Sequence, residues 1–425
     1  MHRFGVMRGV TGGARAGGLW SCLGNVCRTV RSYRSGQAGR SFSSGFARSV
    51  RDPEVGDEDH VFVAMSSGVD SSTVAAMMAE QYPGRVSGVY MANWSSTAKC
   101  TEADWNDVQR ICKFVGIGCE RVNLERDYWT EVFEPMIRMY RQGLTPNPDV
   151  GCNRHVKFGA LFDYLQGKNL SKRWWLATGH YARLGRDEDN GEHWLMRPVR
   201  NPAKDQSYYL SSIDPKTLER VLFPLAPYTK PEVRGLAQRY GLHTASKPDS
   251  QGLCFVSQNH NNFRNFLAEY LEPSPGDIVT EDGKVVGKHN GIWHATIGQR
   301  SSVSMPQADP NYRGVWYVSD KDPVTNRITI VRGVDNPSLY SQSATCDQFD
   351  WLCSDPSTVI SEGGLTAQYR SLQDPVPVEH IDTTNGVKVK FATKCRAIAP
   401  GQYLVLYHGD RVIGSGMISV NSHHD

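Results

Sequence analysis

Three short polar segments of the chain combine residue types that could do chemistry. The first, residues 66–71, reads Ser-Ser-Gly-Val-Asp-Ser, a run of small hydroxyl residues with one glycine and one carboxylate. Such a turn lets backbone N–H groups approach an anion, and a helix beginning there adds a favourable partial charge. The segment is neither a Walker A loop nor a dinucleotide-binding G-x-G-x-x-G motif. Its residues are equally compatible with a phosphate-binding loop and with an ordinary capped helix start.

The second segment contains Cys152 in polar, proline-containing surroundings at the expected start of a helix. Arg154, His155 and Lys157, together with the helix terminus, would favour the thiolate, which is the form of cysteine that attacks electrophiles. A lone cysteine is usually a small buried hydrophobe, as we expect for Cys112 on the apolar face of its helix. The polar context of Cys152 favours the reactive interpretation.

The third segment contains Cys254, which follows a turn and precedes an apolar run. This cysteine could equally well belong to the core, and the pattern barely prefers function. Cys152 and Cys254 are far apart in the chain, so only folding could pair them. Two thiols meeting beside a nucleotide would suit sulfur transfer.

The first two segments lie in a region whose pattern alternates strands and helices. We expect strands at 60–65, 86–91, 119–124 and 174–178, with amphipathic helices between them, one of them kinked or divided by Pro135. Such alternation predicts a parallel sheet, and ligands bind these sheets at the carboxyl ends of the strands. The sequence therefore predicts an α/β, Rossmann-like domain over residues 59–222.

The pattern changes after this domain. Residues 229–232, Thr-Lys-Pro-Glu, have capping-box spacing ahead of an amphipathic helix, and the interval 223–275 is expected to form a small, mainly helical central domain. Short alternating runs separated by turn residues fill residues 276–425. Their spacing predicts a closed antiparallel β-barrel.

The net charge is unevenly distributed. The 425 residues have a formal charge of +3, but residues 1–50 contain eight Arg and no acidic residue. The remainder is therefore negative, so global charge gives no argument for nucleic-acid binding. An Arg- and Ser-rich, acid-free start is typical of an organelle transit peptide, although a basic extension without a targeting role remains open. No apolar run could span a membrane, and ten scattered Cys fit thiols in a reducing compartment.

Taken together, several motifs resemble those of the tRNA-specific 2-thiouridylases of the ATP pyrophosphatase superfamily, in their mitochondrial form. The resemblance covers nearly all of residues 59–418. The motifs are 65–71, 145–149 with Cys152-Asn153, 177–183 (Ala-Thr-Gly-His-Tyr-Ala-Arg), 204–206, 252–255 (Gly-Leu-Cys-Phe), 296–299 and 400–402. The chain departs from the family at Ser67, where the loop usually has glycine.

The resemblance implies ATP-dependent thiolation of the wobble uridine of mitochondrial tRNAs. Because a carbonyl oxygen leaves poorly, the C2 oxygen is first adenylated and then displaced by sulfur. The implied ATP-binding residues are Ala64, Met65, Ser66, Ser67, Gly68, Val69, Asp70, Ser71, Met91 and Gly179. Asp70 would hold Mg²⁺ that accompanies ATP, or handle a proton. No resident metal site is expected.

Cysteine chemistry follows from the same resemblance. Cys254 matches the position that carries a persulfide delivered by an upstream sulfur-carrier protein, and Cys152 matches the nucleophile that resolves it through a transient disulfide. The implied tRNA-binding residues, around a flipped base of the anticodon region, are Asn147, Pro148, Asp149, His180, Lys204, Asp205, Gln206, Tyr369, Arg370 and Gln402. Gln368 stands where bacterial members often have Arg.

Two other functions remain compatible with parts of the pattern. Another ATP pyrophosphatase, transferring nitrogen to a small molecule, would share the 66–71 loop but would need neither Cys152 nor Cys254. A catalytically inert RNA-binding scaffold would keep the fold alone, and Ser67 is the only feature in its favour. The expected location is the mitochondrial matrix, with tRNA and the sulfur carrier as partners and no membrane association.

Overall fold

The structure is a computed structural model that describes residues 50–94, 98–168, 170, 172–198, 200–249 and 263–420. The expected transit peptide, apart from Val50, and the segment that contains Cys254 lie outside these residues. Within the part described, no helix is both long enough and apolar enough to cross a membrane.

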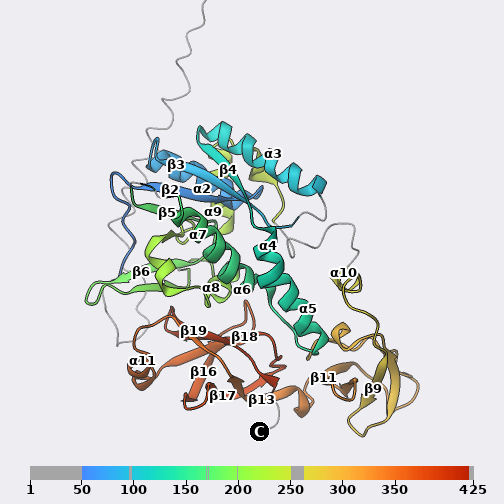
Figure 1. Cartoon of the computed structure of the whole chain (residues 1–425). Coiled ribbons are helices and arrows are strands. Elements are labelled where there is room, and N and C mark those ends of the chain that lie inside the picture. The colour runs from blue at the N-terminus through green and yellow to red at the C-terminus, as the bar shows by residue number, and fades with distance from the viewer. Residues whose placement is uncertain are drawn as a thin grey trace, which may run out of the picture. The chain divides into compact units, whose positions relative to one another are not determined.

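A five-stranded parallel sheet forms the centre of the first domain (Figure 1). In spatial order its strands are β4 (Gly118–Asn123), β3 (Val86–Ala92), β2 (His60–Met65), β5 (Trp174–Ala177) and β8 (Val221–Leu222). Every neighbouring pair runs parallel. The four strands predicted from the sequence are therefore confirmed, and each lies within one residue of its expected ends.

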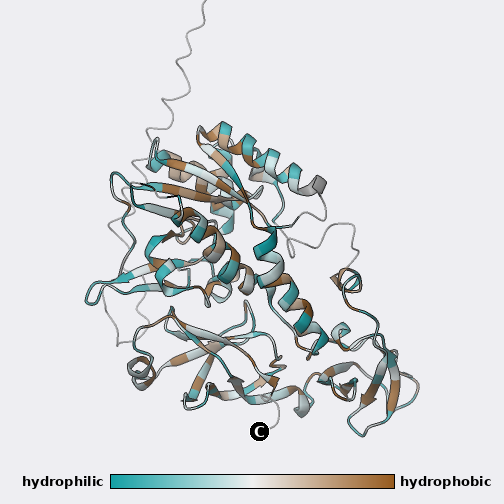
Figure 2. Ribbon diagram, viewed as in Figure 1, coloured by the Kyte–Doolittle hydropathy of each residue, from teal (hydrophilic) through white to brown (hydrophobic). Residues whose placement is uncertain are grey.

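Strand β2 separates two hydrophobic cores because successive side chains of a strand point to opposite faces. Val61, Val63 and Met65 pack into one core with helices α2 (Val69–Gln81) and α3 (Ala98–Val115). Phe62 and Ala64 pack into the other with the helices between residues 125 and 166. Helices cover both faces, so β2 carries apolar residues on both sides rather than alternating with polar ones. Figure 2 shows the contrasting, banded hydropathy of the surface helix α3.

The helices on the second face form two continuous runs, each with a π-helical stretch in its middle. The first consists of α4 (Glu125–Tyr128), a π-helical turn (Trp129–Phe133) and α5 (Glu134–Arg141). Pro135 lies in the first turn of α5, directly after the π turn, and the junction residues Tyr128, Phe133 and Glu134 all keep helical backbone angles. The helix is therefore not divided at this proline but contains a π turn directly before it. The second run consists of α6 (Pro148–Gly151), a π-helical stretch (Cys152–Ala160) and α7 (Leu161–Gln166).

The strand order fixes where a ligand can bind this sheet. From β2 the chain first proceeds outward to β3 and β4 and then returns to β5 on the other side of β2. The order therefore reverses between β2 and β5, and the crevice outside the carboxyl ends of two such strands is the usual ligand site of an open α/β sheet. Residues 66–68 and 178–180 follow these two strands directly.

The expected mainly helical central domain is wrong. Helix α9 (Lys230–Arg239) packs through Ala237 against Val69 and Ala76 of α2, and so covers the parallel-sheet domain instead of forming a core of its own. The middle domain is β-rich, with strands β10 (Val285–His289), β9 (Gly276–Thr280), β12 (Arg327–Arg332) and β11 (Trp316–Asp322) in spatial order. Short helices α8 (Ser207–Leu210) and α10 (Phe263–Leu267) precede it.

The last domain is antiparallel, as predicted, but the strands after residue 275 form two sheets rather than one barrel. Strands β9 and β12 of the middle sheet even pair in parallel. The C-terminal sheet contains β13 (Tyr340–Cys346), β14 (Asp350–Trp351), β15 (Leu365–Gln368), β16 (Val376–Asp382), β17 (Val387–Arg396), β18 (Tyr403–His408) and β19 (Arg411–Met417). Helix α11 (Pro356–Glu362) lies between β14 and β15 in the sequence. It is extended by β1 (Val50–Arg51), β6 (Arg183–Asp187) and β7 (His193–Met196).

Candidate active site

The loop at residues 66–71 connects β2 to α2 at the reversal point of the sheet. Ala64 and Met65 end the buried strand, and Gly68 precedes the first residue of the helix, Val69. The Ser71 side chain closes the loop, because its Oγ accepts a hydrogen bond from the Ser66 N–H at 3.1 Å and lies 3.0 Å from the Ser66 hydroxyl. The first turn of α2 is thereby aimed at the crevice, as anion binding at a helix N-terminus requires.

Ser67, the departure from the usual loop, fits without backbone strain. Its φ angle is outside the left-handed region, so a glycine is not needed at this position. Its hydroxyl donates a 2.5 Å hydrogen bond to Asp104 Oδ1 of α3. Serine at position 67 therefore adds a hydrogen bond between the loop and α3 that glycine could not form.

Gly179 brings the segment after β5 against the first turn of α2. A Cβ atom at this position would lie 3.0 Å from Asp70 Cβ and 3.2 Å from the Ser71 backbone nitrogen. Only glycine allows this approach without displacement. Met91, the other residue expected near the nucleotide, is half-buried near the end of β3, two strands from Gly179.

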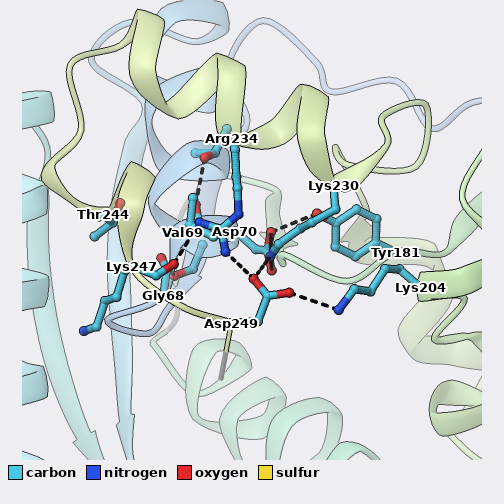
Figure 3. A network of polar contacts seen from close by, with 12 residues as sticks. Gly68, Val69, Asp70, Tyr181, Lys204, Lys230, Arg234, Thr244, Lys247 and Asp249 are labelled. Carbon is cyan, nitrogen blue, oxygen red and sulfur yellow. Dashed lines mark hydrogen bonds and ion pairs between the residues drawn. The ribbon is translucent and has the colours of Figure 1, made fainter. Parts of the chain in front are cut away.

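Asp70 is engaged with a lysine that sequence reasoning did not single out. Lys230 Nζ, at the start of α9, donates to both carboxylate oxygens of Asp70 at 2.8 and 2.7 Å (Figure 3). The Tyr181 hydroxyl donates to Asp70 Oδ1 at 2.9 Å. Burial and then the Asp70 charge raise the pKa of Tyr181, so this hydroxyl is a donor throughout the physiological range. The carboxylate is thus held by two side chains from distant parts of the chain.

Asp249 is the second carboxylate of this network and contacts three cationic side chains. It forms ion pairs with Lys204 at 3.0 Å, Lys230 at 3.1 Å and Arg234 at 2.6 Å. Partial burial raises its pKa, but hydrogen bonds and charges from Lys204 and Lys230 outweigh that effect and lower the pKa to about 2. Asp249 precedes Cys254 by five residues in the chain, and Cys254 itself lies outside the described residues.

Cys152 is a half-buried cysteine in the second turn of the helical run that begins at Pro148. The neighbouring basic groups are partly committed elsewhere: Arg154 pairs with Asp350 of β14, and Lys157 Nζ lies 3.2 Å from Asn153 Oδ1. Burial and then the Arg154 charge lower the pKa of His155, which favours its neutral form. The helix begins at Pro148, so the terminus that was expected to activate Cys152 lies one turn before this residue. Cys112, expected in the core, is buried there, and burial raises its pKa to about 12.

His180 links the Cys152 helix to the segment after β5. Lys157 Nζ lies 3.2 Å from His180 Nε2, and Thr178 Oγ1 lies 2.8 Å from Nδ1. An ammonium can only donate, so Nε2 accepts and Nδ1 carries the proton that it donates to Thr178. Burial and then the Lys157 charge lower the pKa of His180 well below its usual range. Both ring nitrogens of this neutral histidine are occupied within the protein.

The residues expected to contact tRNA divide into exposed and internal groups. Asn147, Pro148 and Asp149 begin α6, and Gln402 lies beside them because its Nε2 donates to Thr145 O at 2.7 Å. Of the other expected contacts, Lys204 is exposed, Asp205 is buried and accepts from the Ser207 N–H, and Gln206 accepts from the Tyr181 N–H. Tyr369 is buried, and Arg370 donates to Ala397 O. Gln368, where family members often have Arg, is buried and accepts from the Tyr407 hydroxyl.

The donor set fits Mg²⁺ that arrives with a nucleotide rather than a resident metal. Among the described residues, no group of three or more His, Cys, Asp or Glu side chains could enclose a metal ion. Mg²⁺ is commonly bound by one or two carboxylates plus substrate phosphates. Asp70 and Asp249 offer this pair, since both contact the same Lys230 ammonium.

Sequence comparison identifies three matching family models. Residues 59–258 match the tRNA methyl transferase HUP domain, 264–332 the tRNA methyl transferase PRC-barrel domain, and 341–418 the aminomethyltransferase beta-barrel domain. The model boundaries agree with the parallel sheet, the β-rich middle domain and the antiparallel sheet described above.

Full-length relatives are also similar. The chain is 48% identical over 390 residues to mitochondrial tRNA-specific 2-thiouridylase 1 of Saccharomyces cerevisiae, covering 86% of this chain and 93% of that protein. It is 41% identical to the Schizosaccharomyces pombe protein of the same name, covering 85% and 90% of the two chains. It is 40% identical to tRNA-specific 2-thiouridylase MnmA of Limosilactobacillus reuteri, covering 87% and 98%.

Proposed function

The chain belongs to the tRNA-specific 2-thiouridylase family, and we propose that it thiolates the wobble uridine of mitochondrial tRNAs at C2. It is an ATP-dependent tRNA sulfurtransferase. The similarity to the Saccharomyces cerevisiae protein over 86% of the chain carries the proposal. A mitochondrial matrix location is inferred from the two fungal relatives and from the basic, acid-free residues 1–50.

In the first half-reaction the C2 oxygen of uridine attacks the α-phosphate of ATP, and pyrophosphate leaves. The 66–71 loop and the first turn of α2 bind the phosphates, while Asp70 holds the metal that accompanies them. When bound, Mg²⁺ offsets charge on the phosphates and the departing pyrophosphate. Gly179 keeps the segment after β5 against this turn and so shapes the nucleotide side of the site.

In the second half-reaction a persulfide on Cys254, loaded by a sulfur-carrier protein, supplies the sulfur. Its terminal sulfur attacks the adenylated C2 carbon, and AMP leaves with the original oxygen. Cys152 then attacks Cys254 Sγ, which breaks the persulfide bond and leaves a Cys152–Cys254 disulfide; alternatively, Cys152 attacks first and sulfide is released at the activated carbon. Asp249 shares Lys230 with Asp70 of the nucleotide loop, and Cys254 follows Asp249 by five residues in the sequence. This proximity in sequence supports a role for Cys254 in the reaction.

For tRNA we propose that Asn147, Pro148 and Asp149 surround the flipped uridine and that Lys204 binds a phosphate. Base extrusion exposes a C2 carbon that stacking otherwise shields. The other family contact positions, His180, Asp205, Gln206, Tyr369, Arg370 and Gln402, would act mainly by fixing the loops that carry these residues. The internal hydrogen bonds of the other five and the burial of Tyr369 support this assignment.

Mass spectrometry of nucleosides from organelle tRNA, with and without the protein, tests the activity directly. We expect 2-thiouridine to disappear without it and to return with the wild-type protein but not with Cys152→Ser or Cys254→Ser. Cys119→Ser, a change at another half-buried cysteine, is the matched control and should restore the nucleoside. Both active-site variants should still bind tRNA. Unchanged 2-thiouridine without the protein would overturn the proposal.

A further inference from the structure

Lys230 occupies a cation position between two carboxylates at the nucleotide loop. Three carboxylate oxygens surround its ammonium: both oxygens of Asp70, at 2.8 and 2.7 Å, and Asp249 Oδ1 at 3.1 Å. An ammonium has three N–H donors, so these contacts can use all of them. Figure 3 shows the lysine side chain reaching from α9 between the two acids.

The two acids depend on Lys230 to different degrees. Asp249 keeps Lys204 and Arg234 as further cationic partners. For Asp70, Lys230 is the one cationic partner found among the described residues. The lysine side chain is only 13% exposed, whereas the Asp70 side chain is 30% exposed. Departure of Lys230 would therefore leave Asp249 paired and would open the Asp70 carboxylate to another cation.

Lys230 and the Tyr181 hydroxyl together donate three hydrogen bonds to the Asp70 carboxylate, which has about four acceptor positions, and the Lys230 ammonium repels another cation, so this pairing opposes Mg²⁺ coordination by Asp70. Asp70 is the second residue of α2, where a bound nucleotide would place phosphate against the helix N-terminus. A phosphate arriving there is the nearest new anion for a displaced ammonium, and lysine is a common phosphate ligand. In this exchange the Lys230–Asp70 ion pair is replaced by two others: Asp70 with the metal, and Lys230 with a phosphate of the nucleotide.

We propose that Lys230 is a phosphate-binding residue that exchanges partners, pairing with Asp70 in the free enzyme and with the phosphates of ATP when the nucleotide and its metal bind. The inference rests on the proposed function, because it assumes that the 66–71 loop binds ATP. It differs from a purely structural ion pair in one respect. Removing the lysine should strengthen metal binding to Asp70 in the absence of nucleotide while weakening ATP binding.

Lys230→Met tests this because it removes the charge and keeps an unbranched side chain. Without nucleotide, Mn²⁺ titrated by electron paramagnetic resonance should bind severalfold more tightly than to wild type. The gain should vanish in the Asp70→Asn/Lys230→Met double variant. With Mg²⁺ present, equilibrium binding of ATP should weaken about tenfold to a hundredfold, the range for a lost charged hydrogen bond.

Two further variants control for charge and folding. Lys247→Met removes a nearby lysine that pairs with Asp107 at 3.2 Å and points away from Asp249, so it should change neither affinity. Lys230→Arg keeps the cation and should retain ATP binding within about threefold of wild type. Folding of each variant is checked by its thermal midpoint and by tRNA binding.

Two results would overturn the inference. One is ATP affinity in folded Lys230→Met within twofold of wild type. The other is unchanged or weakened Mn²⁺ binding in that variant. Because both affinities are measured without sulfur transfer, they are separable from the proposed function, which fails instead if wild-type protein does not thiolate tRNA.

Discussion

Replacing Gly179 by Ala should damage the nucleotide site through steric contact alone. The added Cβ would lie 3.0 Å from Asp70 Cβ, 3.2 Å from the Asp70 carbonyl carbon and 3.2 Å from the Ser71 nitrogen. Two of these three atoms are backbone atoms in the first turn of α2, so no side-chain rotation can relieve the contact. Overpacking of this kind costs about 1 to 3 kcal/mol. The φ angle of Gly179 is outside the left-handed region, so backbone strain adds nothing.

The expected outcome is a lower thermal midpoint and weaker ATP binding, because the first turn of α2 must shift to admit the methyl group. Gly235→Ala on α9 is the matched control, since a Cβ there meets nothing within 4 Å. That change should leave ATP affinity alone and gain up to about 1 kcal/mol from helix propensity. Wild-type stability and ATP affinity in Gly179→Ala would refute the reasoning, because the close approach would then have no energetic consequence.

Three further changes have expected outcomes of different kinds. Ser67→Ala removes the 2.5 Å hydrogen bond to Asp104, and urea unfolding should show a loss of about 1 to 2 kcal/mol. Gly401→Ala forces a side chain onto a φ of +91° and places Cβ 2.8 Å from the Thr145 nitrogen, so limited proteolysis should cleave the variant faster. Burial lowers the pKa of Lys321 from 10.5 to about 8. Its charge therefore destabilises the fold below pH 8, and wild-type stability should rise by up to about 3 kcal/mol between pH 8 and 10.5, while Lys321→Met stays flat over that interval.

The parallel-sheet domain was predictable because its strands are buried on both faces. A strand such as β2 appears in the sequence as a short continuous apolar run, and the intervening helices have a 3.6-residue period. An irregularity near Pro135 was expected from local chemistry alone, since proline cannot donate a helical hydrogen bond, and the structure shows a π turn directly before it rather than a division. These features depend on residues close together in the chain.

The middle of the chain was mispredicted because an amphipathic helix does not identify its packing partner. The capping box at Thr229 and the apolar face of α9 were identified correctly. However, Val233 packs into the core of the parallel sheet and Ala237 packs against α2, more than 150 residues away in sequence. A helix of the first domain was therefore assigned to a domain of its own, and the β-rich character of the middle domain was missed.

The candidate site was predicted in its loop but not in its ion pairs. Small residues and Asp70 after a buried strand were compatible with an anion site and equally with a capped helix start, and the structure places them at the reversal point of the sheet. Lys230 had no such signal, because a lysine after a helix cap is ordinary, and 160 residues separate it from Asp70. Asp205 and Tyr369 show another limit: only the family resemblance suggested that they contact tRNA, and the structure places both in buried positions.

Four consecutive residues, Thr178–Tyr181, connect the two chemical halves of the site. Gly179 packs on the first turn of α2, and the Tyr181 hydroxyl donates to Asp70, so this segment contacts the start of α2 at two points. Between them, neutral His180 accepts from Lys157, five residues after Cys152. A shift of the loop on nucleotide binding must therefore be absorbed within this segment or transmitted to the Cys152 helix. Because His180 is buried and donates to Thr178 as well, the segment has little room to absorb it, which favours transmission.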